Sequence, residues 1–380
     1  MKVLIAMDSF KGNLTSLGVA AIVEKGIKKV FNDALVDKVA IADGGEGTVE
    51  AVVDCLEGEY VYTEVSGPIG GKVKAKYGIV NGTTAIIEMA EASGLPLVPV
   101  EKRNPMLTSC YGTGELIKDA IERGCKKIIM GIGGSATNDG GAGMAAALGV
   151  KFIGRDGNEI PLGGAGLENL ERIDTSGLDL RIKDVEFIVA SDVSNPLCGE
   201  KGASRVFGPQ KGATEEMVSL LDKNLDHLSK IIKRDMGIDI AEIPGAGAAG
   251  GLGAGLMAFC GAKLTKGIDI VLDTIRLEDR IKDVDVVITG EGRVDMQTAF
   301  GKVPVGVAAR AKKFNKPVFA IAGFAEKGAE IVYNYGIDAV MSSMVGPMSL
   351  NDAIVESPRL IEEASERLFR IIRATTGISK

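Results

Sequence analysis

Tryptophan is absent from the 380-residue sequence, and aromatic residues of all kinds make up only 4% of the chain. Proteins that bind single-stranded nucleic acid present aromatic rings on which the bases stack, and this chain has little with which to build such a surface. Its net charge is −7, and no block of basic residues occurs. We therefore expect neither a nucleic acid nor an acidic membrane as its partner.

Histidine occurs only once, as His227, which excludes much chemistry. His227 lies in the polar helical stretch EEMVSLLDKNLDHLSKIIKR, which predicts a position on a solvated helix face. Ser-His-Asp catalysis and histidine-ligated zinc are therefore not expected.

Cysteine is also sparse. Its odd count and its spacing suit neither a disulfide framework nor a metal site, so we expect reduced thiols in a cytoplasmic protein. The cysteines are Cys55, Cys110, Cys125, Cys198 and Cys260.

Long apolar runs are missing too, and none approaches the length of a transmembrane helix. The N-terminal segment MKVLIAMDSF has too short an apolar part for a signal peptide and is typical of a first strand. The sequence contains no GxxxxGKS/T motif and no HRD or DFG set. The chain is therefore neither an ordinary P-loop protein nor a protein kinase.

Glycine, in contrast, is abundant, with 51 residues that cluster in turns. The stretch from Lys126 to Gly143, KKIIMGIGGSATNDGGAG, combines an apolar strand, a turn with six glycines and the start of a helical pattern. This order is typical of a phosphate site, because glycine lets the backbone approach the anion and the helix offers free N–H groups. Asn138 and Asp139 add oxygen atoms suited to Mg²⁺ or to a substrate hydroxyl. The alternative is a tight turn with a helix cap.

The order of the predicted elements indicates an α/β protein with two domains. The N-terminal part alternates strands and helices with polar residues after each strand, as in a doubly wound parallel sheet. From Glu59 to Met89, apolar and polar residues alternate between turns, which predicts antiparallel strands. The β/α pattern returns near residue 270. We therefore predict that residues 1–60 and 270–380 form a Rossmann-like, three-layer α/β/α domain, that residues 61–269 form an inserted mixed α/β domain, and that the active-site cleft lies between them.

Three further segments carry more specific predictions. The glycine-rich residues 154–184 are predicted to be loop-like, and one last helix is predicted from about Asn351 to Ala374. The segment 245–262, GAGAAGGLGAGLMAFCGA, is expected to begin as a loop and to continue as a helix of small residues. Such residues suit either a close approach of the backbone to a ligand or tight packing of a helix, and the sequence leaves both open.

Polar residues gather where the predicted strands end, and five such loops are expected to face one cleft. They contain Asp8, Ser9 and Lys11; Asp43 and Glu46; Ser135, Thr137, Asn138 and Asp139; Ser191, Asp192 and Asn195; and Glu291, Arg293, Asp295, Gln297 and Lys302. Carboxylates that hold Mg²⁺ or accept a proton, together with cations for phosphate, suit phosphoryl transfer. The alternative for each single carboxylate is a helix cap.

Six motifs in these loops carry a resemblance to a known family. They are DSFKG (8–12), DGGEGT (43–48), GGSATNDGG (133–141), ASDVSNPLCG (190–199), GAAGGLGAG (247–255) and TGEGRVDMQT with GK (289–302). In this order they resemble the motifs of the type 1 bacterial glycerate kinase family, across almost the whole chain. The resemblance implies a two-domain α/β protein, one domain Rossmann-like. It also implies ATP- and Mg²⁺-dependent phosphorylation of D-glycerate, with 2-phosphoglycerate as the usual product. We expect a monomer or homodimer, and the sequence does not distinguish the two.

Roles for single residues are inferred from their chemistry. Asp192, Asp43 and Lys11 are predicted to be catalytic, with Asp192 and Asp43 as candidates for the base or a metal ligand, and Glu291 and Asp43 are predicted metal ligands. Predicted substrate-binding residues are Asp8, Ser9, Arg293, Asp295 and Gln297; predicted ATP-binding residues are Gly133, Gly134, Ser135, Thr137, Asn138, Asp139 and Lys302. Two alternatives remain. GIGGSA matches G-x-G-x-x-G/A weakly, which leaves an NAD(P)-dependent oxidoreductase, and a non-enzymatic sugar-acid- or nucleotide-binding regulator is the other.

Overall fold

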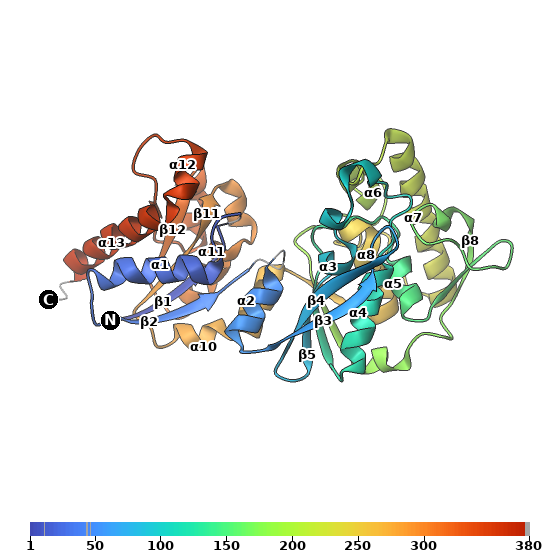
Figure 1. Cartoon of the computed structure of the whole chain (residues 1–380), viewed down its shortest axis with the longest axis horizontal. Coiled ribbons are helices and arrows are strands. Elements are labelled where there is room, and N and C mark those ends of the chain that lie inside the picture. The colour runs from blue at the N-terminus through green and yellow to red at the C-terminus, as the bar shows by residue number, and fades with distance from the viewer. Residues whose placement is uncertain (11, 43–44, 46, 377–380) are drawn as a thin grey trace. The chain divides into compact units, whose positions relative to one another are not determined.

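The computed structural model of the chain describes residues 1–10, 12–42, 45 and 47–376 (Figure 1). Contacts between residues divide the chain into two compact units. Unit 1 comprises the described residues of 1–43, 54–56 and 268–380, and unit 2 comprises those of 44–53 and 57–267. Residues 47–53, which the sequence assigned to the first domain, fall in unit 2. The reason lies in their contacts: Val49 N–H donates to the carboxylate of Glu88, at 3.0 Å.

Unit 1 is built on a sheet of five parallel strands in the order β13-β12-β11-β1-β2. The strands are β1 (Lys2–Met7), β2 (Leu35–Ala40), β11 (Val286–Val294), β12 (Val318–Ala325) and β13 (Ala339–Ser342). The apolar run of β1 is buried on both faces, as expected of a central parallel strand. The chain leaves β1 toward β2 in one direction and leaves β11 toward β12 in the other. The boundary between β1 and β11 is therefore the topological switch point of the sheet.

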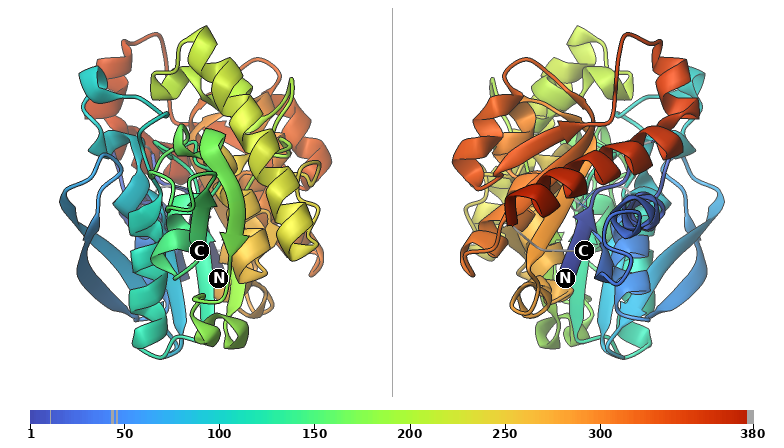
Figure 2. Two further views of the ribbon diagram at one scale, coloured as in Figure 1. Left: turned by 90° about the vertical axis from the view of Figure 1, so that its right-hand side faces the viewer. Right: turned by 90° about the vertical axis from the view of Figure 1, so that its left-hand side faces the viewer.

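Helices cover both faces of this sheet. They are α1 (Ser16–Lys28), α10 (Leu277–Ile281), α11 (Val303–Lys312), α12 (Leu350–Val355), α13 (Ser357–Thr376) and α9 (Gly267–Thr274), which begins at the unit boundary. Helices α1 and α13 contact each other and share a core cluster with Val3, Ile5 and Met7 (Figure 2, right-hand view). Right-handed crossovers in opposite directions put α11 on the other face. Unit 1 is thus a three-layer, Rossmann-like α/β/α unit, which confirms the predicted fold class.

Unit 2 contains a mixed sheet of six strands in the order β10-β9-β6-β5-β4-β3. The strands are β3 (Glu59–Ser66), β4 (Lys72–Val80), β5 (Thr84–Glu88), β6 (Lys127–Gly131), β9 (Glu186–Ala190) and β10 (Lys263–Thr265). Strands β3, β4 and β5 pair antiparallel, as their alternating sequence predicts, whereas β5, β6, β9 and β10 run parallel. The apolar strand Ile128–Met130 of the sequence analysis is β6, near the centre of this sheet.

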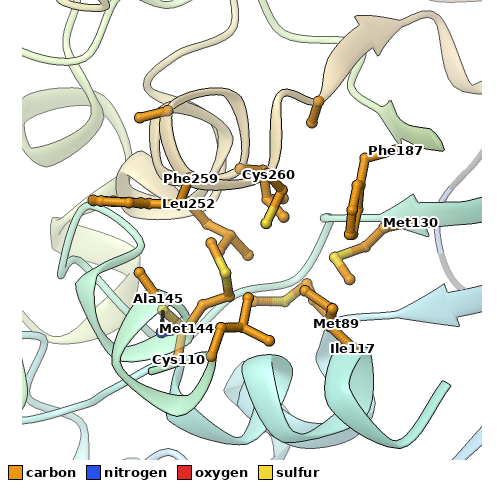
Figure 3. Packing of buried hydrophobic residues seen from close by; sticks show 14 of the residues in the cluster. Met89, Cys110, Ile117, Met130, Met144, Ala145, Phe187, Leu252, Phe259 and Cys260 are labelled. Carbon is orange, nitrogen blue, oxygen red and sulfur yellow. Dashed lines mark hydrogen bonds between the residues drawn. The ribbon is translucent and has the colours of Figure 1, made fainter. Parts of the chain in front are cut away.

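The helices of unit 2 share one core cluster with its sheet, built from aliphatic residues together with alanine, methionine and cysteine. They are α2 (Thr48–Cys55, whose end belongs to unit 1), α3 (Ala90–Ser93), α4 (Tyr111–Glu122), α5 (Ala142–Ala147), α6 (Ala203–Phe207), α7 (Glu215–Met236) and α8 (Ala248–Cys260). Figure 3 shows Met89, Met130, Met144, Leu252 and Phe259 among the buried residues of this core cluster. The amphipathic α7 is capped by Thr214, whose hydroxyl accepts from Met217 N–H at 3.4 Å, and runs along the outside of the unit (Figure 2, left-hand view).

Two sequence predictions about elements are corrected. Residues 154–184 are not only loop: β7 (Lys151–Gly154) and β8 (Leu170–Asp174) pair antiparallel in a separate two-stranded sheet. The predicted last helix is two helices, since α12 ends at Val355 and α13 starts at Ser357. Proline has no N–H and disfavours a helical residue before it, so Pro358 belongs in the first turn of a new helix.

All five cysteines are free thiols. In the part of the chain that the structure describes, no helix is both long and apolar enough to cross a membrane.

Candidate active site

The largest concentration of predicted site residues lies in unit 1, at the switch point between β1 and β11 (Figure 1). A pocket of about 440 Å³ opens there. In doubly wound sheets, ligands bind beyond the carboxyl ends of the strands at such a point. Of the predicted residues, the lining of this switch-point pocket contains Asp8, Ser9, Glu291, Arg293, Asp295 and Lys302.

Asp8 is held at the end of β1 by the backbone of the neighbouring strand. Its N–H donates to the carbonyl oxygen of Gly290, at 2.9 Å, and its carboxylate accepts from Ser9 N–H, at 2.7 Å. Gly290 is required at this crossing, because a Cβ there would lie 1.9 Å from the carbonyl oxygen of Ile321. Asp8 is only 5% exposed, so it presents its carboxylate to the pocket from a rigid position.

Glu291 is a buried carboxylate that faces one hydroxyl and one ammonium group. Its Oε1 accepts from Thr298 Oγ1, at 2.6 Å, and Lys302 Nζ lies 3.7 Å from Oε2. Burial raises the pKa of Glu291, and the bond from Thr298 and the charge of Lys302 oppose the rise. With 7% of its surface exposed, Glu291 is suited to bind a metal ion or accept a proton.

Asp295 serves largely as the helix cap that the sequence left as an alternative. Its Oδ1 accepts from the N–H groups of Gln297 and Thr298, at 2.8 and 3.2 Å, and so begins the 3₁₀ helix Met296–Phe300. Its Oδ2 accepts from Arg293 Nη2, at 2.8 Å. Burial raises the pKa of Asp295, but the bond from Arg293 and the charge of Lys302 hold it below its ordinary value. Gln297 is exposed and its side chain does not line the pocket.

The glycine loop of residues 131–141 lies in unit 2, where Gly133 and Gly134 line a second pocket of about 440 Å³. Among the described residues, the charged side chains that line this glycine-loop pocket are Lys74, Glu88 and Glu91. Burial raises the pKa of Glu88 to about 7, although its carboxylate accepts the N–H of Val49. The sequence marked the glycines but neither glutamate, because Glu88 ends an ordinary apolar strand and Glu91 lies in the short helix after it, without a glycine turn.

The polar side chains of the glycine loop face the interior of unit 2. Thr137, Asn138 and Asp139 have no exposed surface. Asp139 Oδ2 accepts from Cys110 N–H, at 2.9 Å, and Asn138 Oδ1 accepts from Ser204 Oγ, at 3.1 Å. The loop is thus organised as a packed turn, and contact of these side chains with a nucleotide stays a prediction.

Lys211 is the residue of this region that the sequence did not reveal. It is 2% exposed, and its Nζ donates to Ser135 Oγ, at 2.6 Å, and to the carbonyl oxygen of Thr137, at 2.7 Å. Burial lowers its pKa to about 7, against a smaller opposing effect of Asp139. A lysine in the segment FGPQKGA is typical of a solvated loop, so no sequence signal marked it.

The small residues at the start of α8 pack against the same loop. A Cβ on Gly250, which has φ +67°, would lie 2.0 Å from the carbonyl oxygen of Thr137, and Gly140 N–H donates to Gly250 oxygen at 3.0 Å. Of the two uses that the sequence left open, the structure shows tight packing of backbone on backbone.

The other predicted catalytic residues are placed separately or fall outside the described part of the chain. Asp192 follows β9 in unit 2, is exposed, and accepts from Gly267 N–H at the start of α9, at 3.1 Å. Lys11, Asp43 and Glu46 lie outside the described residues. That Asp192 and the switch-point residues face one cavity therefore stays a prediction.

His227 is not on a fully solvated helix face, which corrects the prediction from its polar neighbours. It is half-buried, and its Nε2 lies 2.7 Å from the carbonyl oxygen of Leu170, so the ring ties α7 to β8. His227 therefore has a structural role, because its hydrogen bond joins two elements that are 57 residues apart in the sequence.

The substitution His227→Ala is expected to leave kcat within a few-fold of normal. It should lower the free energy of unfolding by about 1–2 kcal/mol through the lost hydrogen bond. Steady-state kinetics and denaturant unfolding measure the two effects. A hundredfold loss of kcat in a folded variant would contradict this assignment of His227.

Comparisons with known proteins find glycerate kinases that are similar to this chain over almost its whole length. The model of the glycerate kinase family matches residues 3–373. The glycerate kinase of Halalkalibacterium halodurans is 51% identical over 367 residues, which cover 96% of this chain and 97% of that protein. The glycerate 2-kinase of Escherichia coli K12 is 54% identical over 354 residues, 93% of each chain. A crystal structure provisionally named glycerate kinase 2, from Salmonella typhimurium LT2, superposes with a TM-score of 0.91 at 48% identity, covering 100% of both chains. The chain belongs to the glycerate kinase family.

Proposed function

We propose that the protein is a kinase that transfers the γ-phosphoryl group of ATP to a hydroxyl of D-glycerate, with Mg²⁺ as cofactor. The observation that carries the proposal is the switch-point pocket, where the carboxylates of Asp8 and Glu291 and the ammonium group of Lys302 meet. Phosphoryl transfer needs this combination, because catalysis depends mainly on positioning and on neutralising charge that develops on the phosphoryl oxygens.

The donor atoms of the pocket fit Mg²⁺, which prefers oxygen ligands. Glu291 and Asp8 offer carboxylate oxygens in one pocket. Among the described residues, no group of three or more histidine, cysteine, aspartate or glutamate side chains is placed to hold a metal ion. Mg²⁺ in kinases commonly takes one or two carboxylates together with waters and substrate phosphates. In this proposal Glu291 binds Mg²⁺, and the bound ion would neutralise negative charge on the phosphates of ATP.

The cations of the pocket have different surroundings, and this suggests different roles. Lys302 lies between Glu291 and Asp295, 3.7 and 3.8 Å from their oxygens, so its amine is held over the pocket. It would bind the transferred phosphoryl group. Arg293 is exposed and pairs with Asp295 and with Glu326, the latter at 3.6 Å. Its guanidinium suits the glycerate carboxylate.

The product we propose is 2-phosphoglycerate. The name glycerate 2-kinase of the Escherichia coli relative and the resemblance to the type 1 bacterial family support this choice over the 3-position. We also propose a cytoplasmic location, because all five cysteines are free, and reduced thiols persist in that compartment.

Release of ADP from ATP is expected only when D-glycerate and Mg²⁺ are both present, and it is expected to fall to background with excess EDTA. A coupled ADP-release assay measures the rate, and ³¹P NMR of the product distinguishes 2- from 3-phosphoglycerate. An NAD(P)-dependent oxidoreductase would instead change the nicotinamide absorbance, and a regulator would bind without turnover. Glycerate-independent ADP release, or none at all, would overturn the proposal.

A further inference from the structure

The short helix α12 exposes apolar side chains that a helix would ordinarily bury. None of its six residues is buried, and Leu350 and Ile354 are 78% and 41% exposed. The helix is nevertheless anchored. Ser349 Oγ accepts from Asp352 N–H, at 3.1 Å, and Asn13 Nδ2 donates to Ser357 Oγ, at 2.7 Å, just after the end of α12. Hydrogen bonds therefore hold both ends of α12, while Leu350 and Ile354 keep exposed apolar surface.

That face is part of the switch-point pocket. Leu350 and Ile354 line the pocket together with Phe10 and Phe324. Gly292 and Gly323 also line it, and they lie so close that a Cβ on Gly323 would be 2.4 Å from the carbonyl oxygen of Gly292. Bare backbone, aromatic rings and aliphatic side chains in one pocket suit a flat, apolar group.

The polar side chains in this half of the pocket already have partners inside unit 1. Ser343 Oγ donates to Gly323 oxygen, at 3.2 Å, and Ser357 Oγ donates to Ile354 oxygen, at 2.8 Å. Lys302 Nζ lies 3.7 Å from Glu291 Oε2 and 3.8 Å from Asp295 Oδ1, so the charged groups form a cluster of their own, the polar half of the pocket. One pocket thus combines an apolar half with a half that suits a phosphate and its metal ion.

We propose that Leu350, Ile354 and Phe324 form the site for the purine base of ATP. The inference rests on the proposed function, which supplies a ligand with a flat base at one end and phosphates at the other. Glycerate does not fit this half, since it has no apolar surface to bury. The glycine-loop pocket of unit 2 is less suited to ATP, because the charged side chains that the described part of the chain contributes to its lining are two glutamates and one lysine.

The test compares ADP with inorganic tripolyphosphate as probes of the full-length protein with Mg²⁺, by isothermal titration calorimetry. Ile354→Asp is expected to weaken ADP binding at least about tenfold, because a charge replaces an apolar contact with the base, and tenfold corresponds to about 1.4 kcal/mol. Tripolyphosphate binding is expected to change less than threefold. Phe324→Ala should show the same pattern.

Val355→Asp is the matched control, because Val355 is also exposed on α12, at 69%, but does not line the pocket. It should leave both affinities unchanged. Equal weakening of both probes by Ile354→Asp, or no weakening of ADP, would overturn the base site. So would a change of oligomeric state in Ile354→Asp, since α12 would then contact a second copy. Failure of the proposed function is distinct, because it would show as absent ADP release with glycerate in the unsubstituted protein.

Discussion

Replacing Glu291 with glutamine is expected to lower kcat by about 10²-fold or more, while the KM for glycerate changes only a few-fold. Glutamine keeps an oxygen that can accept the 2.6 Å bond from Thr298, so the fold of the loop should survive. What is lost is the negative charge, and with it the capacity to bind Mg²⁺ or to accept a proton. Steady-state kinetics with ATP and D-glycerate measure the effect.

The magnesium dependence of the variant separates the two roles of Glu291. If it binds the metal ion, the Mg²⁺ concentration for half-maximal rate should rise in Glu291→Gln; if it is the base, kcat should fall at all Mg²⁺ concentrations. Glu326→Gln is the matched control, because Glu326 pairs with Arg293 but does not line the pocket. A kcat within fivefold of normal in Glu291→Gln would contradict the assignment. The sequence predicts a similar loss for Asp192→Asn, and a loss there alone would put the essential carboxylate in unit 2.

The sequence predicted the charged residues of the switch-point pocket from their positions near the ends of apolar strands. Asp8 follows the apolar strand β1 and Glu291 lies in the carboxyl-terminal part of β11, and the carboxyl ends of parallel strands meet at one edge of a sheet. Which strands are neighbours was not predictable from local pattern, since β1 and β11 are separated by most of the chain. The sequence did not reveal the apolar side chains of the pocket either. Leu350 and Ile354 have the pattern of ordinary core positions in a helix.

The glycine loop shows the opposite case. Its motif was recognised, but the orientation of its side chains depends on distant partners. Asp139 reaches Cys110, Asn138 reaches Ser204, and Ser135 reaches Lys211, across separations of 29, 66 and 76 residues. A pattern of residue types does not encode whether an aspartate after a glycine turn faces a ligand or the interior. His227 was misjudged for this reason too, since its partner Leu170 belongs to another element.

Lys211→Met is expected to loosen the glycine loop strongly. Methionine fills most of the space of the lysine stem, but Ser135 Oγ and the carbonyl oxygen of Thr137 lose the donor that now lies 2.6 and 2.7 Å away. Two buried groups without partners cost about 2–4 kcal/mol together, even though the cost of burying an amine is removed. Amide hydrogen exchange in residues 133–141 should accelerate roughly thirtyfold or more. Lys201→Met, at an exposed position nearby, should leave exchange unchanged.

The pH dependence of the free energy of opening tests whether the amine of Lys211 is what holds the glycine loop. Burial lowers the pKa of Lys211 to about 7 in the folded protein, whereas an unfolded lysine has a pKa near 10.5. Between these values the unfolded state binds more protons, so the free energy of opening should rise as pH increases above 7. The slope cannot exceed about 1.4 kcal/mol per pH unit for one group, and a rise on the order of 1–2 kcal/mol from pH 7 to 9 is expected. This rise should vanish in Lys211→Met. If both proteins show the same pH dependence, or exchange is unchanged at pH 7, Lys211 does not hold the loop.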